Sequence, residues 1–102
     1  MIIRISKGRF EHDRLDQVDR LLAASEDALR DALQELPGLM HYYVGIDRDA
    51  ETVTNTSVWD TIEHARAMND LQPMLGQRPV LEAAGVEFDR ITNHEVLWSI
   101  DP

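Results

Sequence analysis

The feature that most constrains the fold is a strand pattern at residues 52–59 that runs into a helix pattern without an intervening loop. The side chains of TVTNTSVW alternate between two faces, and most of them are β-branched or aromatic, as strands favour. Asn55, Ser57 and Trp59 therefore share one face of the strand. The stretch presents an amide and an indole together, directly before a helix.

A second strand pattern, LMHYYVGID at residues 39–47, comes just before this stretch. Only the polar residues 48–51 separate the two patterns. Two strand patterns joined by such a short polar segment predict an antiparallel hairpin.

The first third of the chain predicts a strand at residues 1–9 and an amphipathic helix at residues 13–35. Apolar residues recur there at alternating steps of three and four, the spacing of one helix face: Leu15, Val18, Leu22, Leu29, Ala32 and Leu36. Pro37 and Gly38 end the helix. Ser25 interrupts the apolar stripe and offers an alternative, a second cap that breaks or kinks the helix.

After the hairpin, a second helix is predicted from Thr61 to about residue 70. Either Asp60, with Glu63 completing a capping box, or Thr61 can cap it. The prolines and glycines that follow predict only one or two short helical turns: Pro73, Gly76, Pro79 and Gly85. The closing run predicts a last strand at about residues 93–100.

The resulting order, β-α-β-β-α-β, is that of an α+β ferredoxin-like fold with a four-stranded antiparallel sheet and two helices on one face. We expect residues 1–102 to form a single domain. Apolar residues on both faces of the strands predict that the uncovered face pairs with a second copy of the chain. The face with Tyr42, Val44 and Ile46, joined by Trp98 and Ile100, is our candidate for that dimer contact.

Composition excludes several classes of function. Nineteen Asp and Glu residues against ten Lys and Arg give a formal charge of −9, which disfavours nucleic acid and anionic membrane surfaces as partners. The chain has no Cys, and its His residues fit no metal-ligand spacing, so we expect no metal. No signal peptide or membrane-spanning pattern occurs, which favours a cytoplasmic protein.

Four segments of the chain resemble the antibiotic biosynthesis monooxygenase family of the dimeric α/β-barrel superfamily. They are the helix end Leu36-Pro37-Gly38, the hairpin with Gly45 and Asp47, the joint Ser57-Val58-Trp59-Asp60, and the closing run at residues 93–98. The resemblance implies homodimers whose two sheets face each other in a barrel. Some members oxidise polycyclic aromatic phenols with molecular oxygen and without cofactor, some cleave haem, and others have no known activity.

Within this resemblance, Asn55 and Trp59 match the Asn-x-x-x-Trp of the cofactor-free oxygenases, which implies that both are catalytic. The chain departs from that pattern at Ala65, where one oxygenase type has Tyr, and in its first strand, which offers Arg4, Ser6 and Lys7 rather than an Asn. The positions expected for the haem-cleavage residues hold Met68 and Arg78, so that activity is set aside.

Other residues are candidates for the substrate pocket. If the hairpin register allows, His41 and Tyr43 share a face with Asn55 and supply a base and a phenol donor. Further candidates are Ser57, His64 near the pocket mouth, and Met68 in a flexible lid.

Two functions remain open from the sequence. The first is a monooxygenase, or a related isomerase, that acts on a hydrophobic, phenol-like metabolite without cofactor. Asn55 and Trp59 act there as hydrogen-bond donors, assisted by a histidine or Tyr43. The second is a non-catalytic dimeric module that binds a small ligand or has a stress or regulatory role, with Trp59 as a core residue.

Overall fold

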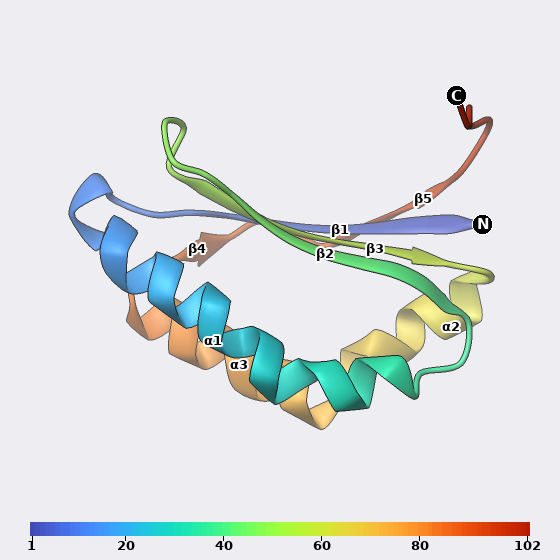
Figure 1. The fold of residues 1–102 in the computed structure, drawn as a ribbon, viewed down its shortest axis with the longest axis horizontal. Helices are drawn as coiled ribbons and strands as arrows, with labels where there is room; N and C mark the ends of the chain where they lie inside the picture. Colours follow the sequence, from blue (N-terminus) through green and yellow to red (C-terminus); the bar gives the residue numbers. More distant parts are fainter.

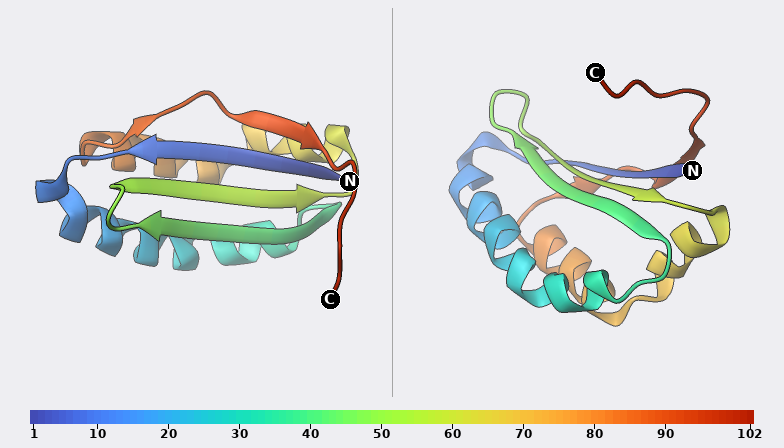
Figure 2. Two further views of the ribbon diagram at one scale, coloured as in Figure 1. Left: turned by 90° about the horizontal axis from the view of Figure 1, so that it is seen from above. Right: turned by 45° about the vertical axis from the view of Figure 1, so that its right-hand side comes forward.

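The structure is a computed structural model that describes residues 1–102, and it consists of one antiparallel sheet with helices on one face (Figure 1). Its elements are β1 (Ile2–Arg9), the 3-10 turn η1 (His12–Arg14), α1 (Leu15–Gln34), β2 (Leu39–Asp47), β3 (Thr52–Trp59), α2 (Ile62–Ala67), the 3-10 turn η2 (Met68–Asp70), α3 (Gln72–Ala83), β4 (Glu87–Phe88) and β5 (Thr92–Glu95). The sheet order is β2-β3-β1, with β4 and β5 both paired to the other edge of β1 (Figure 2). The predicted ferredoxin-like fold is confirmed.

Helix α1 is continuous through Ser25, so the helix has no break at that residue. The Ser25 hydroxyl donates to the carbonyl oxygen of Leu22 at 2.6 Å, which satisfies it within the helix. The first turn of the predicted helix forms as the 3-10 turn η1. None of the helices combines the length and the apolar character that a membrane-spanning helix needs.

The hairpin strands β2 and β3 have the predicted bounds, and Thr61 caps the helix that follows. The Thr61 hydroxyl accepts a hydrogen bond from the backbone N–H of His64. Asp60 instead contacts the imidazole Nδ1 of His64 at 2.7 Å. Gly38 has a φ of +79°, and a Cβ there would collide with both Asp60 and His64, so the turn before β2 requires glycine.

The predicted short turns after residue 70 are wrong, because residues 72–83 form one helix, α3. Pro73 lies in the first turn, where a missing N–H breaks no helical hydrogen bond. Pro79 lies inside the helix and removes one hydrogen bond, but Pro79 and Leu75, whose carbonyl group is freed, are both exposed, so water can satisfy that group. The helix therefore tolerates both prolines.

The predicted last strand, residues 93–100, is also wrong in extent. Strand β5 ends at Glu95, and the N–H of Val96 makes a final backbone hydrogen bond to the Met1 carbonyl oxygen. Beyond Val96, β1 offers no further partner, and the tail leaves the sheet (Figure 2). Its apolar residues are open to solvent: Leu97 is 85%, Trp98 75% and Ile100 71% exposed.

The buried core is divided into two clusters between the sheet and the helices. Cluster A contains Phe10, Val18, Val53, Leu81 and Val86. Cluster B contains Leu29, Leu33, Trp59, Ala65 and Met68. Because β3 contributes Val53 to one cluster and Trp59 to the other, the two clusters occupy opposite ends of the same strand face.

Candidate functional site

Between the two core clusters, the helix-facing side of the sheet carries polar side chains. Arg4 pairs with Ser57, which also pairs with Tyr42, while Ser6 pairs with Asn55. Helix α1 places the hydroxyl group of Ser25 opposite them. We call this set the polar belt: Arg4, Ser6, Ser25, Tyr42, Asn55 and Ser57. A belt of this kind is unfavourable as core packing, because buried polar groups must find partners.

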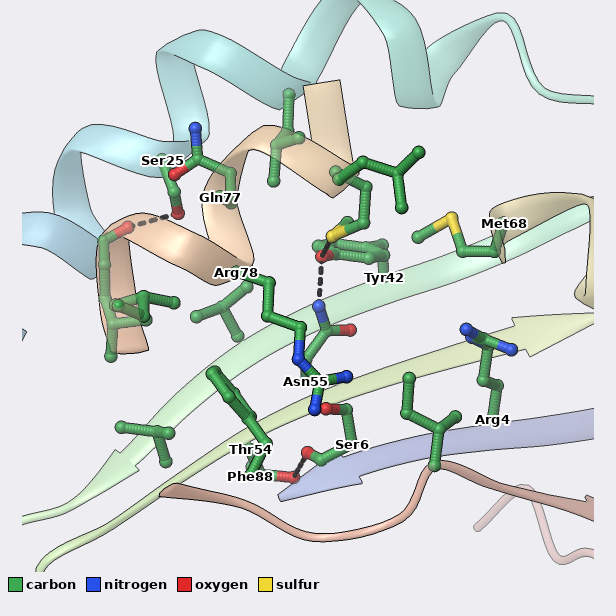
Figure 3. Close-up of a pocket in the computed structure, with 18 of the residues that line it drawn as sticks. Arg4, Ser6, Ser25, Tyr42, Thr54, Asn55, Met68, Gln77, Arg78 and Phe88 are labelled. Atoms are coloured by element: carbon green, nitrogen blue, oxygen red, sulfur yellow. Dashed lines mark hydrogen bonds between the residues drawn. The ribbon is translucent and has the colours of Figure 1, made fainter. Parts of the chain in front are cut away.

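A cavity of about 290 Å³ lies at the polar belt, between the sheet and the helices α1 and α3 (Figure 3). All belt residues except Ser57 line it. Much of the remaining wall is apolar and comes from both core clusters and α3, with Leu22, Leu29, Val53, Met68, Met74, Leu81 and Phe88 among the lining residues. This combination of an apolar wall and a few converging polar groups is typical of small-molecule sites.

A groove between α1 and the edge strand β2 adjoins the cavity. Ser25, Tyr42 and Val44 line both spaces. The groove and the cavity therefore share a wall that includes two residues of the polar belt, Ser25 and Tyr42.

Asn55 and Tyr42 form the central hydrogen bond of the cavity. The Asn55 amide N–H donates to the Tyr42 phenol oxygen, and that oxygen lies 4.0 Å from the Met74 sulfur (Figure 3). Burial raises the pKa of the Tyr42 phenol to about 12, although Asn55 and the Arg4 charge both act to lower it. Tyr42 is consequently a neutral phenol at neutral pH and supplies a donor rather than a base.

The titration of Tyr42 gives a direct test of this environment. The folded chain holds the phenol proton more tightly than the unfolded chain, so stability should fall as pH rises from about 10 towards about 12. An absorbance titration of tyrosinate should show a step near pH 12 that is absent from Tyr42→Phe. Persistence of that step in the variant would contradict the assignment.

Arg4 is the charged member of the polar belt. Its side chain rises from β1 beside Met68 (Figure 3), and the residue is only 8% exposed. One guanidinium N–H donates to the Asn69 amide oxygen at 2.7 Å. Burial lowers the pKa of Arg4, an effect that the nearby Tyr42 partly opposes.

The register of the hairpin corrects the expected positions of His41 and Tyr43. His41 pairs with Val58 and Tyr43 with Thr56, so both lie on the sheet face away from the helices, where their rings stack at 6.0 Å. The phenol beside Asn55 is therefore Tyr42 and not Tyr43. The expected dimer face with Tyr42, Val44 and Ile46 was wrong for the same reason, since those residues face the helices.

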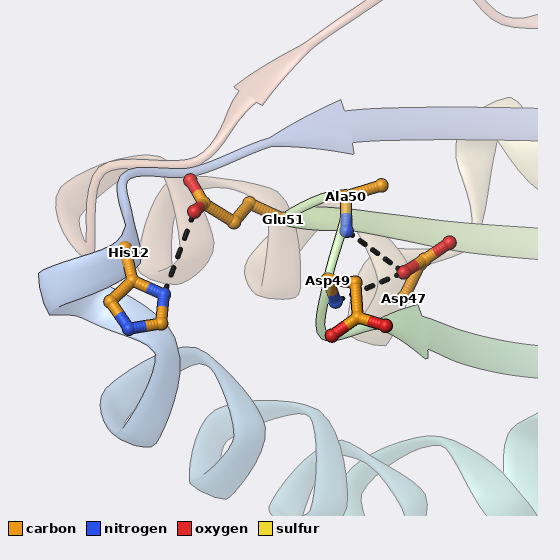
Figure 4. A network of polar contacts seen from close by, with 5 residues as sticks. All are labelled: His12, Asp47, Asp49, Ala50 and Glu51. Atoms are coloured by element: carbon orange, nitrogen blue, oxygen red, sulfur yellow. Dashed lines mark hydrogen bonds and ion pairs between the residues drawn. The ribbon is translucent and has the colours of Figure 1, made fainter.

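The turn between β2 and β3 contains the signal that could have revealed this register. The Asp47 carboxylate accepts hydrogen bonds from the N–H groups of Asp49 and Ala50, and Glu51 has a φ of 59° (Figure 4). This closed turn pairs Asp47 with Thr52. Counting back along both strands from that pair places Tyr42 opposite Ser57.

The other predicted site residues separate into three locations. Met68 lines the cavity, as expected. Trp59 is 0% exposed and does not line it, because it packs in cluster B and its indole N–H donates to the Ser57 hydroxyl at 2.8 Å. His64 lies outside the cavity at the start of α2, paired with Asp60.

The remaining histidines lie at the surface and away from one another. His12 contacts Glu51 at 3.5 Å (Figure 4), and His94 bonds to the Thr92 hydroxyl at 2.8 Å. No three His, Cys, Asp or Glu residues come together in a way that could hold a metal ion.

Several solved structures share this fold over nearly the whole chain. A Deinococcus radiodurans protein assigned to the antibiotic biosynthesis monooxygenases superposes with a TM-score of 0.76 at 19% identity, over 100% of this chain and 98% of that one. A variant of SnoaB, a cofactor-independent oxygenase from Streptomyces nogalater, gives 0.72 at 11% identity, over 99% and 97%. A Nitrosomonas europaea protein with the same assignment as the first gives 0.72 at 16%, over 96% and 100%.

By sequence alone, the chain matches no family model and no curated protein. At these low identities the likeness concerns the fold and leaves the reaction to be argued from the site. The resemblance expected from the sequence is confirmed at that level: the chain has the fold of the antibiotic biosynthesis monooxygenase structures.

Proposed function

We propose that the chain is a cofactor-independent monooxygenase whose substrate is a hydrophobic, phenol-like small molecule. The observation that carries the proposal is the largely apolar cavity that reaches Asn55 in the middle of the sheet. Its wall suits a flat aromatic substrate, while the Asn55 amide keeps one N–H beyond the one given to Tyr42. That N–H can donate to a substrate oxygen on which negative charge develops.

The reaction needs no cofactor electrons if the substrate supplies them. An ionised phenol activates a neighbouring ring CH₂ group to react with O₂. One oxygen atom then replaces the two hydrogens as a carbonyl group, and the other leaves as water. The substrate carbon loses the four electrons that O₂ gains, so the step balances without metal or flavin. The protein contributes orientation, a dry site and donors to the anion.

Trp59 enters this proposal as a positioning residue. Its indole N–H holds Ser57, which pairs across the sheet with Arg4 on one side and Tyr42 on the other. Asn55 acts on the substrate directly, and Tyr42 fixes the orientation of its amide group.

The packing of Trp59 also supports the second candidate function, a non-catalytic binding module. The indole is enclosed by core residues and has no N–H left for a ligand. In that case the cavity binds a small hydrophobic molecule and no reaction follows.

Oxygen uptake separates the two candidates. The protein, dialysed against a chelator and free of flavin or haem absorbance, is mixed with a panel of hydroxylated bicyclic and tricyclic aromatics. We expect one O₂ to be consumed per substrate oxidised, with an oxygen atom from ¹⁸O₂ in the product. Binding without uptake across the whole panel would support the binding module and contradict the oxygenase.

We further propose that the chain is a homodimer joined through the sheet face away from the helices. That face carries Ile3, Ile5 and Val58, and the exposed tail residues Leu97 and Trp98 extend from the same sheet. In the single chain, no helix packs over these strand residues or over the tail residues (Figure 1). The cytoplasmic location also stays a prediction.

Sedimentation should give a dimer at micromolar protein, with an interface above about 2,000 Å² if it is obligate. Of the two tryptophans, Trp98 should account for any blue shift of emission on association, because Trp59 is already buried. Replacing Ile5 by Glu should yield monomers. A wild-type monomer at that concentration would contradict the proposal.

A further inference from the structure

Arg4 is buried without an acidic partner. Four exposed arginines each have a carboxylate oxygen within 4.0 Å, in the pairs Arg9–Asp89, Arg30–Glu26, Arg48–Asp19 and Arg78–Glu82. Arg4, at 8% exposure, has only the amide oxygen of Asn69. In most proteins a buried charge is paired with an opposite charge, whereas here the exposed arginines are paired and the buried one is not.

The missing carboxylate does not reflect a shortage of acids. The chain has nineteen Asp and Glu residues against ten Lys and Arg, yet none reaches Arg4. The guanidinium group cannot relieve the cost of burial by losing its proton, because it stays charged at any ordinary pH. Most of its donors are also left without a partner in the chain.

The cavity supplies the space in which such a partner can lie. Arg4 lines it together with Tyr42 and Asn55, so three different donors converge on one region. The other charged lining residues, Arg78 and Glu82, lie 3.6 Å apart and offset each other. The charge of Arg4 is therefore the uncompensated one at the cavity wall.

We propose that the cavity binds its ligand as an anion, an aromatic molecule whose ionised oxygen, phenolate or carboxylate, pairs with the Arg4 guanidinium group. This specificity rests on the site of the proposed function and holds whether or not a reaction follows. If the ligand is a phenol, the same contact favours its ionised form, which is the form that reacts with O₂.

The test is calorimetry with two probes of matched shape, 2-naphthoate and its neutral analogue 2-naphthamide. Wild-type protein should bind naphthoate at least about tenfold more tightly, the effect expected for a charge-assisted hydrogen bond. Arg4→Met, which keeps the apolar stem, should abolish this preference and leave naphthamide affinity nearly unchanged. Arg9→Met, a change on the same strand outside the cavity, should behave as wild type.

A third probe, 2-naphthol, distinguishes phenolate from carboxylate recognition. If the site takes phenolates, absorbance should show bound naphtholate at a pH where the free compound is protonated, and Arg4→Met should remove the signal. Selection of naphthoate without this shift would assign the site to carboxylates.

Equal affinities for naphthoate and naphthamide in the wild type would overturn the proposal. So would a preference that survives in Arg4→Met while the melting temperature falls, because Arg4 would then be structural. If Arg4→Met does not fold, Arg4→Gln and Arg4→Lys replace it, and only the lysine variant should keep part of the preference. Anion selectivity without oxygen uptake would refute the oxygenase and leave this inference intact.

Discussion

Replacing Asn55 by alanine is expected to lower turnover by about 10²–10³-fold, the loss found when one donor to a developing oxyanion is removed. Asn55 projects from the middle of β3 into a cavity, so its loss leaves little new empty space in packed core. We therefore expect the melting temperature to change little. The measurement is turnover and thermal melting of the variant, once an oxidisable substrate is found.

His41→Ala is the matched comparison for this experiment. His41 lies on the opposite sheet face and lines the adjoining groove rather than the cavity, so turnover should persist in a variant that keeps its oligomeric state. Full activity in folded Asn55→Ala would remove the amide from the mechanism. Loss of activity in His41→Ala alone would restore the histidine as a candidate base.

Replacing Trp59 by alanine should reduce the free energy of unfolding by about 3–5 kcal/mol, as for other buried aromatic residues. Trp59 is the largest fully buried side chain and packs against Leu29 and Leu33 of α1 and Ala65 of α2. For a chain of this length the loss corresponds to a fall in melting temperature of roughly 12 °C or more. Denaturant unfolding, at a fixed protein concentration, measures it.

Two further variants divide the effect of Trp59 into its parts. Ser57→Ala leaves the buried indole N–H without an acceptor, which should cost about 1–3 kcal/mol. Trp59→Phe keeps most of the aromatic volume and should cost less than the alanine variant. If Trp59→Phe abolished turnover at nearly unchanged stability, the indole would act on the substrate directly, as the sequence resemblance implies.

Local patterns in the sequence were enough to predict the elements of the fold. Alternating β-branched residues and a short polar segment gave the bounds of β2 and β3 as the structure has them. The helices were harder to delimit, because the effect of a proline depends on its surroundings. Pro79 removes a hydrogen bond because it lies inside α3, but the exposure of Pro79 and Leu75 to water makes that loss tolerable.

The candidate site was only partly predictable, because it depends on contacts between distant strands. Asn55 and Met68 were found from the sequence and line the cavity. Tyr42 was placed on the wrong face, since strand alternation assigns two faces without saying which one the helices cover. Arg4 was named in the sequence only as a departure from the oxygenase pattern, because a strand arginine is ordinarily exposed. Its burial follows from its pairing with Ser57 and from the packing above the sheet.

The division of the core into two clusters affects how readily mutations can change the ligand preference of this protein. Clusters A and B each hold one end of the sheet against the helices, while the polar belt between them, apart from Tyr42, contributes little apolar packing. Changes at polar belt residues can therefore alter ligand preference with little effect on the core, whereas the apolar part of the cavity wall is shared with both clusters. In laboratory selection, Ser6 and Asn55 can be randomised together at a modest cost in stability, whereas substitutions at Val18 or Trp59 remove folded variants from the library.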